Sequence, residues 1–160
     1  MQSGQPMSQN HYPRFFLMLA ASFGIMYVVM YLNTYEWDHV YFSLMRFYMT
    51  CLMVVPMGLI MLGFMGAMYP RRELNLFIGG AGSVLFVVVY FLMRTQSFVD
   101  DTRWMEAMIP HHSIAILTSE RASIQNPEVR KLADGIIATQ KREIGEMKAL
   151  IKQLKAQPTH

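Results

Sequence analysis

Three long apolar runs dominate the first part of the chain. They cover residues 15–32, 47–69 and 74–93, and none of them contains a charged side chain. Because an α-helix rises about 1.5 Å per residue, each run is long enough to cross the roughly 30 Å hydrocarbon core of a bilayer. The first run is longer than the apolar part of a usual signal peptide and two more runs follow it, so we expect it to be retained. The pattern predicts a membrane domain of three transmembrane helices over residues 1–94.

Over residues 95–156 the pattern changes to apolar residues at helical spacing among polar ones. This pattern is typical of amphipathic helices that face water on one side. Ser97 or Asp100 can cap a first helix that runs through Met108. Pro110 lacks a backbone N–H and restricts the residue before it, so we expect a kink or a restart of the helix there.

A second amphipathic helix is expected to start at Asn126 and Pro127, which suit the N-cap and the first helical position. From Val129 onward the apolar positions form one helical stripe, which Gln140 interrupts. The short connection between the two helices predicts an antiparallel hairpin. Some sixty residues make only a marginal core by themselves, so we expect support from dimerisation or from the third span. The predicted fold class is all-α, with three transmembrane helices followed by an extramembrane hairpin.

Composition and charge narrow the choice of function. Charged residues make up 16% of the chain, below the roughly 25% of an ordinary soluble domain, and the deficit lies in the first 93 residues. The net charge is only +3 and no run of five like charges occurs, so nucleic acid is not an expected partner. Cys51 is the one cysteine and cannot form an intramolecular disulfide.

The charges of the loops predict an orientation in the membrane. Arg14 precedes the first apolar run, and Arg71 and Arg72 lie between the second and the third. Placing these arginines in the cytoplasm leaves Glu36 and Asp38, which follow the first run, outside. Two other arginines, at helix ends, oppose this assignment, but their long side chains can snorkel to the interface. We expect a multi-pass protein of the bacterial inner membrane with a cytoplasmic N-terminus and a periplasmic C-terminal domain.

Methionines recur along the second apolar run at a constant spacing of four residues, at Met45, Met49, Met53, Met57, Met61 and Met65. In a helix this spacing drifts by about 40° per step, so the six side chains form an inclined ridge. We favour the interpretation that the ridge packs against a neighbouring helix, since methionine is an adaptable filler. The alternative is a track of thioether ligands for Cu(I) or Ag(I).

Seven residues of the C-terminal domain are candidates for a metal site or its surroundings: Met105, Met108, His111, His112, Gln140, Glu143 and Met147. Met105, Met108 and His112 are spaced by three and four residues and share one helix face. An antiparallel hairpin would bring Met147 towards them. Thioether and imidazole ligands suit a soft monovalent ion, and affinity should fall as the pH drops through about 6, where imidazole gains a proton. The alternative is that the two histidines only make polar contacts near a helix start.

Two segments of this region resemble a known family. "MIPHHSIAI" and "IIATQKREIGEMKALI" resemble the DUF305 domain, a ferritin-like helical family of bacteria, over roughly residues 97–154. The three preceding spans, with "MYPRRELN", resemble its membrane-anchored subgroup. The resemblance implies a link to copper or silver handling in the periplasm, with Met108, His111, His112, Gln140, Glu143 and Met147 as signature positions. Thr118 and Ser119 stand where many relatives carry a methionine, so this chain offers one soft ligand fewer.

These observations favour a membrane-anchored, non-catalytic metal-binding protein, with Met105, Met108, His111, His112 and Met147 as ligands of Cu(I) or Ag(I). The alternative is a structural protein whose hairpin docks a partner or a second copy without metal. A di-iron oxidase is not supported around the histidine pair, because Glu106 stands five residues before His111 instead of three. No nucleophilic triad, phosphate-binding loop or His-Glu-x-x-His motif is present, so an enzyme is not expected.

Overall fold

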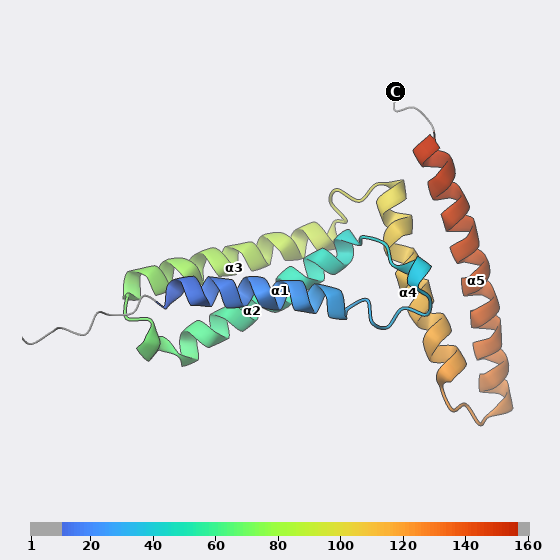
Figure 1. Ribbon diagram of the computed structural model, residues 1–160, viewed down its shortest axis with the longest axis horizontal. Helices are drawn as coiled ribbons and strands as arrows, with labels where there is room; N and C mark the ends of the chain where they lie inside the picture. The colour runs from blue at the N-terminus through green and yellow to red at the C-terminus, as the bar shows by residue number, and fades with distance from the viewer. Residues whose placement is uncertain (1–10, 157–160) are drawn as a thin grey trace, which may run out of the picture.

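The computed structural model describes residues 11–156, and this part of the chain contains no strand. Its five α-helices are α1 Tyr12–Val29, α2 Leu44–Phe64, α3 Arg72–Arg94, α4 Asp101–Arg121 and α5 Pro127–Ala156. Helices α1, α2 and α3 lie side by side, and the α4–α5 hairpin crosses one end of them (Figure 1). The predicted all-α fold is confirmed. The N-terminal residues that the charge pattern assigns to the cytoplasm lie largely outside the described residues.

The three apolar helices are long and apolar enough to cross a membrane. Each helix begins two or three residues before its apolar run. The first four backbone N–H groups of a helix have no partner within the helix, so polar residues that satisfy them fit in or before the first turn. Ser43, for example, caps α2 by accepting a hydrogen bond from the backbone N–H of Arg46. The prediction that the second span continues to Tyr69 is wrong. Helix α2 ends at Phe64, where two glycines of low helix propensity flank the last turn, and a short 3-10 turn follows.

Helix α2 contacts both of its neighbours in the membrane domain. A Cβ atom added to Gly58 would lie 3.1 Å from the Leu19 side chain of α1. One added to Gly82 of α3 would lie 3.0 Å from the Leu59 side chain. Gly82 is the glycine of α3 that packs against α2, whereas a Cβ at Gly80 would meet open space. The close approach of α3 to α2 therefore depends on one glycine.

The loop between α1 and α2 ties the membrane helices to the hairpin. The hydroxyl of Ser113, a fully buried residue of α4, accepts a hydrogen bond of 2.7 Å from the backbone N–H of Tyr35 and lies 3.0 Å from Nδ1 of His39. Burial, helped by the charge of Lys148, holds the pKa of His39 below its ordinary value although two nearby carboxylates raise it. Lys148 of α5 also bonds Asp38 and thereby lowers the pKa of that carboxyl. The loop thus contacts both helices of the hairpin.

Helix α4 is continuous through Pro110, so the expected restart at this residue is not observed. Asp100, not Ser97, caps it and accepts a bond of 2.8 Å from the N–H of Arg103. A proline inside a helix removes one backbone hydrogen bond. Ile109 and Pro110 are both fully buried, and Ile109 belongs to the core that α4 shares with α5. The core that α4 shares with α5 consists of Met105, Ile109, Ile116, Ile144, Met147 and Ile151.

Helix α5 starts as predicted, with the Asn126 side chain accepting bonds from the N–H groups of Glu128 and Val129. Its apolar stripe is only partly buried. Residues on one flank of the stripe stay exposed, with fractions of 49% for Val129, 65% for Leu132, 36% for Ile136, 48% for Leu150 and 38% for Leu154. One partner helix cannot cover so wide a stripe, so a flank of α5 remains uncovered in the single chain.

Replacing Gly82 by valine should destabilise the membrane domain by about 1–3 kcal/mol, because the new side chain must push α3 away from Leu59. Gly80→Val is the matched control, since it adds the same side chain to the same helix in open space. Thermal unfolding in detergent, followed by circular dichroism, measures both. An equal loss of stability in the two variants would contradict the close packing of α2 and α3.

Candidate functional site

The two neighbouring histidines lie on different sides of α4. The ring of His112 faces α5, where its Nε2 lies 2.9 Å from a carboxylate oxygen of Glu143, while its Nδ1 lies 3.0 Å from the backbone oxygen of Met108. A carbonyl oxygen only accepts hydrogen bonds, so Nδ1 donates, and the short contact at Nε2 also contains a proton. Neither ring nitrogen therefore has a free lone pair. His112 links the two helices of the hairpin, and Gln140 lies half-buried one turn before Glu143.

Met105 and Met147 come together in the hairpin core, as the antiparallel arrangement predicted. Their exposed fractions are 5% and 7%, and isoleucines make up the rest of the buried cluster. With both nitrogens of His112 already engaged, this cluster offers thioethers but no available imidazole. The five predicted ligands therefore do not form one site in the hairpin.

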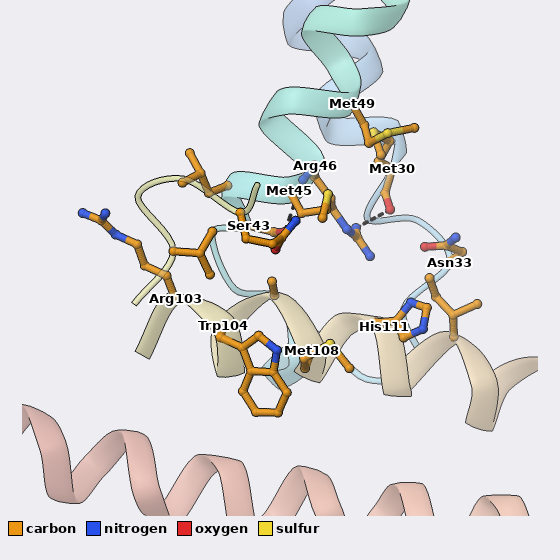
Figure 2. A pocket seen from close by; sticks show the side chains of 15 residues that line it. Met30, Asn33, Ser43, Met45, Arg46, Met49, Arg103, Trp104, Met108 and His111 are labelled. Atoms are coloured by element: carbon orange, nitrogen blue, oxygen red, sulfur yellow. Dashed lines mark hydrogen bonds between the residues drawn. The ribbon is translucent and has the colours of Figure 1, made fainter. Parts of the chain in front are cut away.

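Met108 and His111 instead line a cavity of about 460 Å³ at the junction between α4 and the membrane helices. Three more methionines line the same cavity, Met30 at the end of α1 and Met45 and Met49 in the first turns of α2. Figure 2 shows the membrane-domain methionines on one wall, with Met108 and His111 on the α4 wall opposite. The cavity thus gathers four thioethers and one imidazole from three helices.

A positive charge lies in the wall of this cavity. Arg46 is 8% exposed, its guanidinium donates to the backbone oxygen of Met30, and it lies 4.1 Å above the centre of the Tyr31 ring. Within residues 11–156, no carboxylate forms an ion pair with Arg46. Asn33 and Ser43 add polar groups to the wall. Any occupant must therefore tolerate both soft sulfur ligands and a nearby guanidinium.

The methionine ladder splits into parts with different surroundings. Met45 and Met49 face the cavity, while Met53 is 44% exposed on the outside of the bundle. Met61 packs against an aromatic cluster at the far end, which includes Tyr12. The methionines of α2 therefore do not form the single packing ridge that their spacing suggested. The drift of 40° per step turns successive methionines towards different neighbours.

The sequence-based reasoning missed the role of Met30, Met45 and Met49 as cavity residues. The sequence did contain a signal, because the methionine ladder begins at the start of the second span, directly after the loop that contains Glu36 and Asp38. Relating that end to His111 required knowing how α4 sits on the membrane domain. Glu36 was predicted only as a loop charge, although His39 follows it at a spacing of three residues.

Comparison with known proteins places the C-terminal hairpin. Residues 101–160 match the family described as "Domain of unknown function (DUF305)". A protein of Acanthamoeba polyphaga mimivirus, "Uncharacterized protein L153", is 36% identical over 75 residues, which make up 46% of this chain and 49% of that protein. The matched segment therefore spans about half the length of this relative. No solved structure matches the chain. The resemblance read from the histidine and glutamine motifs is confirmed: the hairpin of α4 and α5 is a DUF305 domain, preceded by three apolar helices.

Proposed function

We propose that this protein is a membrane-anchored, non-catalytic binder of a soft monovalent metal ion, Cu(I) or Ag(I). The observation that carries the proposal is the cavity at the junction of α4 with the membrane helices, where Met30, Met45, Met49, Met108 and His111 meet. Thioethers select soft ions, and an imidazole lone pair completes a neutral ligand set for them. The cavity is larger than an ion, so the flexible methionine side chains close around it on binding.

The charge of Arg46 favours a monovalent over a divalent occupant. Thioether and imidazole ligands are neutral and cancel none of the charge of the ion. Coulomb repulsion from the guanidinium is therefore twice as large for a divalent ion at the same place. The backbone oxygen of Met30 and the face of the Tyr31 ring present partial negative charge to the guanidinium, which offsets part of this repulsion.

This proposal retains only two of the ligands that the sequence suggested, Met108 and His111. Met105 and Met147 then serve the core of the hairpin, and His112 serves the link to Glu143. Methionines of the membrane domain take the vacated ligand roles. The DUF305 domain would thus supply half of the site and its anchor the other half.

The proposed location is the bacterial inner membrane, with the cavity and the hairpin on the periplasmic side. The support is the charge of the loops: Arg71 and Arg72 lie at the end of the bundle away from the hairpin, and Glu36 and Asp38 lie beside the hairpin. A cavity on the outer side would meet soft metal ions before they reach the cytoplasm.

The double variant Met108→Leu/His111→Gln should bind Ag(I) at least about tenfold more weakly than the wild type, because it removes one thioether and the imidazole from the cavity. The measurement is titration of the full-length protein in detergent with Ag(I), and with Cu(I) in competition with a chelator. Met53→Leu is the control, since it removes an exposed thioether of α2 that does not line the cavity.

A different pair of variants separates the cavity from the hairpin core. If Met105→Leu/Met147→Leu abolished Ag(I) binding while Met108→Leu/His111→Gln left it intact, the site would lie between α4 and α5 and the proposal would be wrong. Leucine preserves the volume of methionine closely, so the core of these variants should stay folded.

Replacing Arg46 by glutamine should tighten Ag(I) binding, because it removes a positive charge from the cavity wall while keeping a donor for the Met30 carbonyl. The same titration measures the effect, and a thermal melt confirms that the variant is folded. Weaker Ag(I) binding by the folded variant would contradict a cation in this cavity.

Self-association is a second candidate function, which the exposed apolar flank of α5 favours. A second copy that covered Leu132 and Ile136 would bury apolar surface that the single chain leaves in water. Leu132→Glu/Ile136→Glu should then shift the protein to a smaller species in light scattering, at constant detergent. Lys131→Glu, next to the flank, is the control for charge. An unchanged mass in the double variant would remove this candidate.

A further inference from the structure

A second group of ligand atoms lies outside the cavity, on the loop between α1 and α2. The side chains of Glu36, Asp38 and His39 each offer one ligand atom, and these atoms lie within 4.8 Å of one another. We propose that these three residues bind a divalent cation of the Zn²⁺ type. This site is distinct in place and in chemistry from the cavity of the proposed function, and it does not depend on that function.

The distances within the group suit one small ion. Nε2 of His39 lies 3.7 Å from Oε2 of Glu36 and 3.6 Å from Oδ1 of Asp38. Such separations are too long for hydrogen bonds. Ligands about 2.1 Å from a tetrahedral Zn²⁺ lie roughly 3.4 Å from each other, so the two distances from His39 need to shorten by only a few tenths of an ångström. The short 3-10 turn over Trp37–His39 keeps Glu36 and His39 close, because the backbone N–H of His39 donates to the backbone oxygen of Glu36 at 3.2 Å.

The second observation is the orientation of the imidazole. The side chain of His39 is only 7% exposed, and its Nε2 points at the two carboxylates. Its Nδ1 lies 3.0 Å from the hydroxyl of Ser113, which also accepts the N–H of Tyr35. When Nδ1 donates to this hydroxyl, the lone pair of Nε2 faces two anionic oxygens. A cation between them relieves that repulsion, and a partner at the far nitrogen is the usual arrangement for a metal-binding histidine.

Access and charge also fit a divalent ion. The side chains of Glu36 and Asp38 are 56% and 64% exposed, so an ion can enter from solvent. Lys148 bonds Oδ2 of Asp38 at 2.5 Å and leaves Oδ1 for the ion. Two carboxylates and one lysine leave a net charge of −1 around the neutral imidazole. Lys141 also borders this region and pairs with Glu120 at 3.7 Å.

The ligand types separate this site from the cavity. Two carboxylates and one imidazole suit a borderline or hard divalent ion and are poor ligands for Cu(I). The cavity offers four thioethers and an imidazole beside a guanidinium. Zn²⁺ and Ag(I) should therefore bind at different places on one chain.

The test is a Zn²⁺ titration of the full-length protein in detergent, after treatment with a chelator, in competition with a fluorescent zinc indicator. We expect one Zn²⁺ per chain at this loop, and at least about tenfold weaker binding in Glu36→Gln and in His39→Gln. Glu128→Gln, an exposed carboxylate in the first turn of α5, is the matched control. Glu36 is exposed, so its variant decides the question even if His39→Gln fails to fold.

Lys148→Gln adds a readout that a purely structural role of the loop would not produce. Removing the positive charge beside Asp38 should tighten Zn²⁺ binding, whereas loosening the loop would weaken it. Unchanged Zn²⁺ affinity in both Glu36→Gln and His39→Gln, or no Zn²⁺ binding by the wild type, would overturn the proposal. Loss of Ag(I) binding in the Met108→Leu/His111→Gln variant tests the cavity alone, so either proposal can fail without the other.

Discussion

The position of the hairpin on the membrane domain depends on one buried hydroxyl. Ser113 of α4 accepts the N–H of Tyr35 and meets the ring of His39. Helix α4 crosses one end of the bundle (Figure 1). A buried polar group without a partner costs about 1–3 kcal/mol, so these contacts restrict how α4 can sit on the loop. The cavity beside Met45 and the ligand geometry at His39 both follow from that placement.

Adjacent histidines acquire different chemistry because a helix turns by about 100° per residue. His112 faces α5, and its two ring nitrogens contact the Met108 backbone oxygen and the Glu143 carboxylate. His111 faces the membrane domain and remains exposed beside the cavity methionines. A motif of two histidines is therefore divided between holding the hairpin together and facing a candidate ligand site. The three apolar helices thus supply part of the lining of the cavity that His111 borders.

Much of the architecture was predictable because it depends on local rules. Uncharged apolar runs predicted the three membrane helices, and Asn126 with Pro127 predicted the start of α5, where the cap needs only its own backbone. The expected restart at Pro110 was wrong, because a rule for neighbouring residues does not include the burial of Ile109 and Pro110 within the folded chain. The apolar stripe of α5 was predicted correctly, but the spacing of its residues does not show which flank another helix covers.

The sequence by itself determined the helices, the membrane character of the first three and the family of the last two, since periodicity, hydropathy and a linear motif are properties of neighbouring residues. Only the tertiary structure decided which candidate side chains meet. Met108 and His111 face Met45, whereas Met105 and Met147 fill a core, because the crossing of α4 over α2 joins residues some sixty positions apart. Such a crossing is set by packing between distant elements, and no local pattern encodes it.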